Sequence, residues 1–137
     1  MLQPSSATLA GAVLLSVVGI AYGGTFMLRV VTRQVQANDL QRSFFRAGHA
    51  HAGVLVILGL VVVQLIDSAG VGGVPRGLST GVLWAAILTP AGFFLSVLGR
   101  DPRKPNRLIW MVWAGAAVLT VGLVAAGWGL LSTGLRG

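Results

Sequence analysis

Long apolar runs follow one another along the whole chain, separated by short polar or basic segments. A helix that crosses the hydrocarbon core of a bilayer needs roughly 20 predominantly apolar residues. Four runs meet this requirement, at residues 8–28, 47–66, 78–98 and 108–131. The pattern predicts an all-α, polytopic integral membrane protein in which four transmembrane helices form a bundle, with residues 1–137 as one domain.

The connections between the runs differ in composition. Residues 68–77, SAGVGGVPRG, hold glycines and a proline, so we expect a short flexible turn outside the membrane. Residues 101–107 hold two prolines among basic residues and predict a stiff basic turn. The side-chain oxygen of Asn38 can accept from the free amides of a first helical turn, so the second helix should begin near Leu40. The missing amide of Pro90 predicts a kink inside the third run.

Composition supports the membrane interpretation. The 137 residues are 55% hydrophobic and only 9% charged, whereas soluble domains carry about a quarter of charged residues. The net charge of +7 does not indicate nucleic-acid binding, because that reading requires a basic face on a water-exposed fold. The absence of cysteine excludes disulfides, thiolate metal sites and cysteine nucleophiles.

The basic residues predict the orientation. Two connecting segments carry four Lys or Arg each, whereas the turn at 68–77 and the C-terminal tail carry one each. Because basic loops stay in the cytoplasm, we expect both basic segments to be cytoplasmic and both termini to lie outside the cell membrane. The basic side chains should also contact anionic lipid head groups. They are Arg29, Arg33, Arg42 and Arg46 in the first segment and Arg100, Arg103, Lys104 and Arg107 in the second.

Two tryptophans in the fourth run fit the same interpretation. Trp110 and Trp128 are 18 residues apart, which is roughly 27 Å along a helix and five full turns. We therefore expect both side chains on one helix face, as aromatic anchors at the two membrane interfaces.

His49 and His51 are the candidate cofactor-binding residues, because they are the only side chains that titrate near neutral pH. Two residues apart on a helix, they point about 200° away from each other. They cannot chelate one metal ion together, nor can they supply both axial ligands of one haem. A haem or a divalent metal would therefore need a further ligand from elsewhere.

A polar stripe on the second helix favours His49 over His51 as a metal or proton-relay residue. The stripe lies within about 40° of one line, and polar residues in an apolar helix are expected to face protein or water. We therefore expect this face to lie inside the bundle, with a close helix contact at Gly53, and His51 on the opposite side. Asp67 is roughly 27 Å from His49 along the helix, too far for the two to pair. The stripe consists of Arg42, Arg46, His49, Gly53, Leu60, Gln64 and Asp67.

Three functions remain open from the sequence. The first is an accessory or scaffold subunit of a membrane complex, or a homo-oligomer, that acts through small-residue helix faces. The second is a haem- or metal-binding, redox-linked subunit that uses His49 and His51. The third is a channel or transporter protomer, which the lack of an acidic residue near the midplane disfavours. The sequence offers no nucleophile and base within reach of each other, so we do not expect an enzyme. The small-residue faces are Thr8, Gly11, Gly19, Tyr22 and Gly23 on the first helix and Ala85, Thr89, Gly92 and Ser96 on the third.

Overall fold

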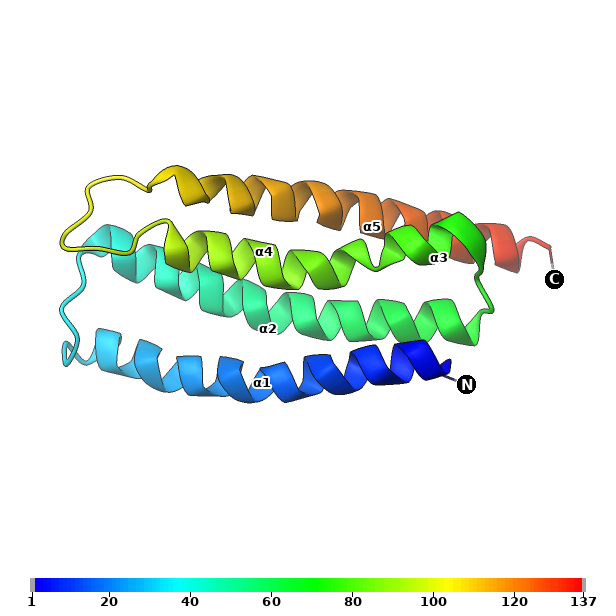
Figure 1. Ribbon diagram of the computed structural model, residues 1–137, viewed down its shortest axis with the longest axis horizontal. Coiled ribbons are helices and arrows are strands. Elements are labelled where there is room, and N and C mark those ends of the chain that lie inside the picture. The colour runs from blue at the N-terminus through cyan, green and yellow to red at the C-terminus, as the bar shows by residue number, and fades with distance from the viewer. Residues whose placement is uncertain (1, 137) are drawn as a thin grey trace.

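The computed structural model describes residues 2–136, and its regular elements within that range are all helical, as the sequence predicts (Figure 1). Four stretches of the described chain are long and apolar enough to cross a membrane: Pro4–Val31, Asp39–Ser68, Gly73–Leu95 and Arg107–Gly134. The elements are α1 (Pro4–Val31), α2 (Asp39–Ser68), α3 (Gly73–Ser79), α4 (Gly81–Leu95), η1 (Arg107–Ile109) and α5 (Trp110–Gly134).

The third stretch differs most from the prediction. The chain is helical from Gly73, so the expectation of a turn that extends to Gly77 is wrong. Only a few residues connect α2 to α3, and Gly70 and Gly73 have φ angles of +66° and +62° there, which glycine adopts without a Cβ penalty. Pro75 is tolerated because its missing amide falls in the first helical turn, where amides have no helical partner.

The interruption in this stretch lies at Thr80, between α3 and α4. The sequence predicts a kink at Pro90. This residue lies inside α4, and the helix continues on both sides of it. The helix ends at Leu95, three residues before the predicted boundary. Asn106 stops it there, because its side-chain amide donates to the Leu95 carbonyl and its backbone amide donates to the Ser96 carbonyl at 2.7 Å.

The predicted start of the second helix is confirmed by a capping box. The Asn38 side chain accepts from the Gln41 amide at 2.8 Å, and the Gln41 side chain accepts from the Asn38 amide at 3.1 Å. The same two side chains also reach the loop after α4. Gln41 donates to the carbonyls of Val97 and Gly99, and Asn38 donates to the Asp101 carboxylate. The cap therefore joins two segments that lie far apart in sequence.

The long helices lie side by side in the order α5, α4, α2, α1, and α3 continues the line of α4 against α5 (Figure 1). Glycines allow α4 and α5 to approach closely. A Cβ atom added at Gly92 would lie 2.6 Å from the Val112 backbone nitrogen, and one added at Gly122 would lie 2.8 Å from the Val82 backbone nitrogen. Both distances are too short for a real Cβ atom, so glycine is required at these crossings.

Helix α1 is peripheral and packs on α2. Its buried residues, Ser6, Met27 and Val30, lie near its two ends. At the C-terminal end, Phe26 packs edge-on against Phe45 of α2 with ring centroids 5.4 Å apart. Helix α1 is therefore attached to the bundle mainly at its two ends.

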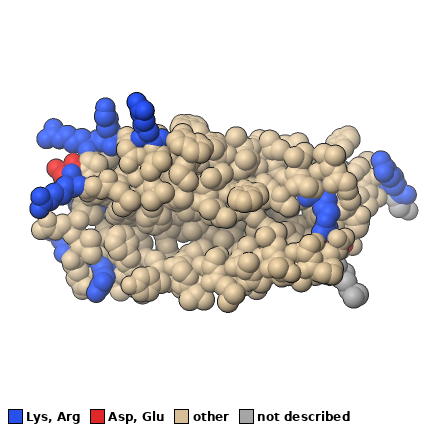
Figure 2. Space-filling view, viewed as in Figure 1, with Lys and Arg blue, Asp and Glu red and all other residues tan. Residues whose placement is uncertain are grey.

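Both basic connections lie at one end of the molecule, and α1 begins and α5 ends at the other (Figure 1). Figure 2 shows most of the visible Lys and Arg side chains gathered at the first end, and the long middle of the face in view carries no charged side chain. We call these the basic end and the terminal end.

Candidate functional site

A slot separates the middle of α1 from α2 and α4. Its volume is about 570 Å³, within the range of roughly 300–1,000 Å³ that is usual for small-molecule sites. Figure 2 shows the hollow along the upper side of α1. The walls are apolar over most of the length, and His49 is the one titratable residue that lines the slot among those described.

His49 occupies the part of the slot nearest the basic end. A Cβ atom added at Gly23 would lie 3.7 Å from Nδ1 of His49, and one added at Gly24 would lie 3.7 Å from Nε2. Both distances correspond to ordinary van der Waals contact, so the imidazole lies beside α1 at these two glycines. Within residues 2–136, no hydrogen bond reaches either ring nitrogen, and neither is sealed from its surroundings. The ring can donate or accept one hydrogen bond, or ligate one metal ion, from within the slot.

His51 lies on a different face of α2. Its Nδ1–H donates to the Ala47 carbonyl at 2.7 Å, and its ring packs on Phe93 of α4 with centroids 5.2 Å apart. The side chain is exposed. The structure does not bring His49 and His51 together, and no three His, Asp or Glu residues of the described chain cluster as a metal site.

The expectation that the polar stripe of α2 lies inside the bundle is wrong for Arg46 and Gln64, because the stripe divides into separate environments. Arg42 pairs with the exposed Asp39 at 2.8 Å, and Arg46 is exposed. Gln64 is also exposed and donates to the Ser68 hydroxyl at 3.1 Å. At the terminal end of the same helix, Asp67 is buried.

The expectation of a close helix contact at Gly53 is wrong. A Cβ atom added at Gly53 would meet nothing within 4 Å, whereas one at Gly48 would lie 2.8 Å from the Phe94 ring, and one at Gly59 would collide with Leu83. The face of α2 that makes the tight contact is therefore not the polar stripe. It is the face that contains Gly48 and Gly59, because α4 rather than α1 packs closely against α2.

A buried ion pair at the terminal end escaped the sequence analysis. The Asp67 carboxylate, with 1% of its side chain exposed, pairs with Arg76 of α3 and accepts from the Gln3 backbone amide at 2.9 Å. Arg76 also donates to the Ser6 hydroxyl at 2.9 Å. The cluster ties the start of α1 to α2 and α3. The only hint of this pair in the sequence is that Asp67 and Arg76 lie close to the two ends of the turn between the second and third apolar runs.

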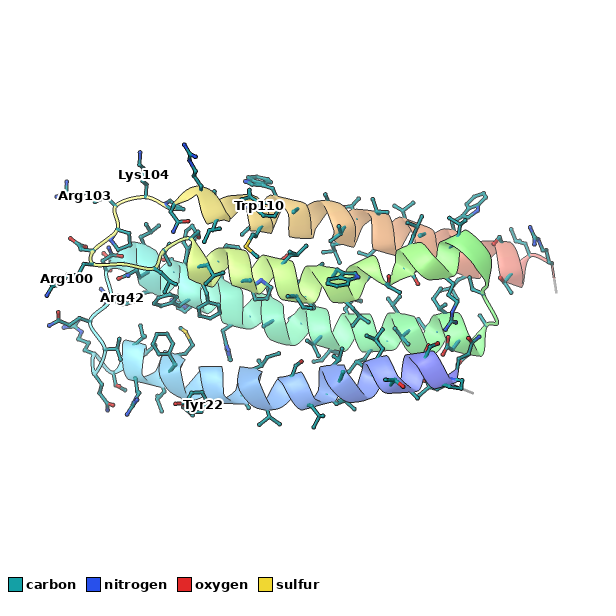
Figure 3. All side chains as sticks on the ribbon, viewed as in Figure 1. Tyr22, Arg42, Arg100, Arg103, Lys104 and Trp110 are labelled. Atoms are coloured by element: carbon teal, nitrogen blue, oxygen red, sulfur yellow. The ribbon has the colours of Figure 1, made fainter. Side chains whose placement is uncertain are left out.

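The basic turn after α4 projects into open surroundings. Figure 3 shows Arg100, Arg103 and Lys104 extending from the basic end. All three side chains of the turn are exposed, as is Arg107. Their positions allow contact with an anionic surface at that end of the molecule.

Comparison with models of known families, with curated proteins and with solved structures finds no match to this chain.

Proposed function

We propose that the protein is an integral membrane protein that acts through helix association, as a homo-oligomer or as an accessory or scaffold subunit of a membrane complex. Four long apolar helices support membrane insertion. So do the exposed Trp110 and Trp128 side chains, which lie at opposite ends of the apolar length of α5. With Lys and Arg gathered at one end, the positive-inside rule places the basic end in the cytoplasm and both termini outside the cell membrane.

The low burial of α1 carries the proposal. Only 6% of the most apolar 18-residue window of α1 is buried inside the protein. The corresponding share is 33% for the window of α2 and 39% for the window of the stretch that contains α4. Association in lipid depends on helix packing and interhelical hydrogen bonds. A helix that makes so few of these contacts within its own chain has most of its surface available for another one.

The outward face of α1 is the surface we propose for association. Leu15, Val18 and Tyr22 are 75%, 69% and 74% exposed, and their spacing places them on one face of the helix. Gly11 continues this face toward the N-terminus, with open space around it. In Figure 3, Tyr22 points away from the other helices. The phenol offers an interhelical hydrogen bond, and the glycine allows close approach.

Disulfide cross-linking tests this surface directly, because the chain contains no cysteine. Val18→Cys should cross-link under mild oxidation in native membranes, either to a dimer of this chain or to one partner of defined mass. Val124→Cys is the matched control, since Val124 is 67% exposed and belongs to α5, which lies at the opposite side of the bundle from α1 (Figure 1). Equal cross-linking of the two variants, or none in either, would contradict the proposal.

A second candidate function rests on His49. His49 lines the slot and makes no hydrogen bond within the described residues, so the protein could act as a haem- or metal-binding, redox-linked subunit. An absorption spectrum and a metal analysis of the purified protein test this function. A Soret band or a stoichiometric metal that is lost in His49→Ala and retained in His51→Ala would support it.

A further inference from the structure

The slot is held open by structure at both ends. At the terminal end, the pair of Asp67 and Arg76 binds the start of α1 through the Gln3 amide and the Ser6 hydroxyl. At the basic end, the Phe26 ring of α1 packs on Phe45. Between these two attachments α1 stands away from α4, so the space is not a local packing defect.

The dimensions of the slot suit one lipid chain. Its lining on α1 runs from Leu9 to Gly23, which is roughly 21 Å along the helix axis. A hydrocarbon core of about 30 Å holds two layers of chains, so each chain occupies about 15 Å of depth. One acyl chain that enters from the basic end therefore fits within the length of the slot.

Among the described lining residues, the polar side chain without a hydrogen-bond partner lies toward the basic end of the slot. The Ser16 hydroxyl donates to the Val13 carbonyl at 2.6 Å, and the Thr80 hydroxyl donates to the Gly77 carbonyl at 2.7 Å. Both hydroxyls are thus satisfied by their own helices. His49 alone offers an uncommitted polar contact among the described lining residues, and a polar group without a partner is costly in an apolar medium. The occupant should therefore be apolar along its length and polar at one end.

The charge around that end favours an anionic head group. Arg46 lies on the same face of α2 as His49, about 4.5 Å further along the axis toward the basic end. It is exposed and makes no ion pair within residues 2–136. A guanidinium binds a phosphate through charge-assisted hydrogen bonds. The ester carbonyl of a phospholipid lies just below its phosphate, at the level where an imidazole N–H can donate to it.

We propose that the slot binds one acyl chain of an anionic phospholipid, with its ester carbonyl at His49 and its phosphate at Arg46. The site is separate from the outward face of α1 and does not depend on helix association. A lipid held there fills the space between α1 and the other helices and satisfies the imidazole.

Native mass spectrometry of the detergent-purified protein tests the chain site. The protein is equilibrated with equal amounts of palmitoyl-oleoyl phosphatidylglycerol and palmitoyl-oleoyl phosphatidylcholine, and the retained lipid is measured for each monomer. Gly19→Leu should fill the slot and lower the retained phosphatidylglycerol at least tenfold. Gly127→Leu is the matched control, because an added Cβ atom meets open space at both glycines but only Gly19 lines the slot.

Head-group recognition is tested with arginine variants. Arg46→Gln should lower the preference for phosphatidylglycerol over phosphatidylcholine about tenfold, as expected for the loss of a charge-assisted contact. Arg136→Gln, an exposed arginine at the terminal end, should leave the preference unchanged. Ala12→Leu also fills the slot and replaces Gly19→Leu if circular dichroism shows that the latter does not fold.

Several results would overturn the proposal. Equal lipid retention in Gly19→Leu and Gly127→Leu would show that the lipid does not occupy the slot. Equal retention of the two lipids by the unmodified protein would show that the head group is not recognised. A third result would show that the slot holds a different molecule. In that case a chromophore or a neutral lipid such as a quinone co-purifies at one per chain and is lost in Gly19→Leu.

Discussion

Gly122 offers the sharpest test of the packing between α4 and α5. An alanine methyl group at this position would lie 2.8 Å from the Val82 backbone nitrogen and 3.1 Å from the Val82 Cγ2 atom. Overpacking costs roughly 1–3 kcal/mol, and the upper end applies here because the nearest atom belongs to the backbone and cannot rotate away. Alanine recovers about 1 kcal/mol through its higher helix propensity. Gly122→Ala should therefore lower the free energy of unfolding by about 2 kcal/mol.

Gly127 on the same helix is the matched control. A Cβ atom there meets nothing within 4 Å, so Gly127→Ala should raise the free energy of unfolding by about 1 kcal/mol through helix propensity alone. Titration with SDS in mixed micelles, followed by circular dichroism, measures both values. If the two variants are equally stable, α4 and α5 do not cross at Gly122 as described.

Two further predictions concern the ends of the molecule. Asp67→Asn should lower the free energy of unfolding by about 3 kcal/mol, because it leaves the Arg76 charge beside a neutral buried side chain. Asp39→Asn should change the free energy of unfolding little, since its pair with Arg42 is exposed. A similar loss of stability in both variants would contradict the role of the buried cluster. Single cysteines in the basic connections of intact cells should resist a membrane-impermeant maleimide, whereas those at the terminal end should react, and the reverse pattern would overturn the orientation. The labelling positions are Gln36 and Lys104 at the basic end and Ser5 and Gly72 at the terminal end.

The sequence alone determined the four long apolar helical stretches, but not the division of the third at Thr80. Helix formation depends on local hydrogen bonds and on apolar length, and both can be read from short windows. The Asn38 cap was predictable for the same reason, because its partner Gln41 lies three residues away. Two long helical stretches separate the two basic connections along the chain. If each stretch crosses the bundle once, both connections lie at the same end, however the helices pack against one another.

Sequence reasoning was less successful at choosing the packed faces. It selected Gly53 from the polar stripe, whereas Gly48 and Gly59 make the tight contacts with α4. All three are glycines in one apolar helix, and each could serve a close crossing. Which of them does so depends on the direction from which α4 approaches, and no local pattern records that direction.

Only the tertiary structure revealed the slot and the surroundings of His49. The sequence separated His49 from His51 by their angle on the helix, but it could not show that Gly23 and Gly24 of α1 lie opposite the His49 ring. Nor could it show that Asp67 reaches Arg76 and the start of α1. These contacts join segments up to 64 residues apart. They depend on how whole helices pack, which attaches α1 at its two ends and leaves the slot along its middle, and no short window of the sequence records that packing.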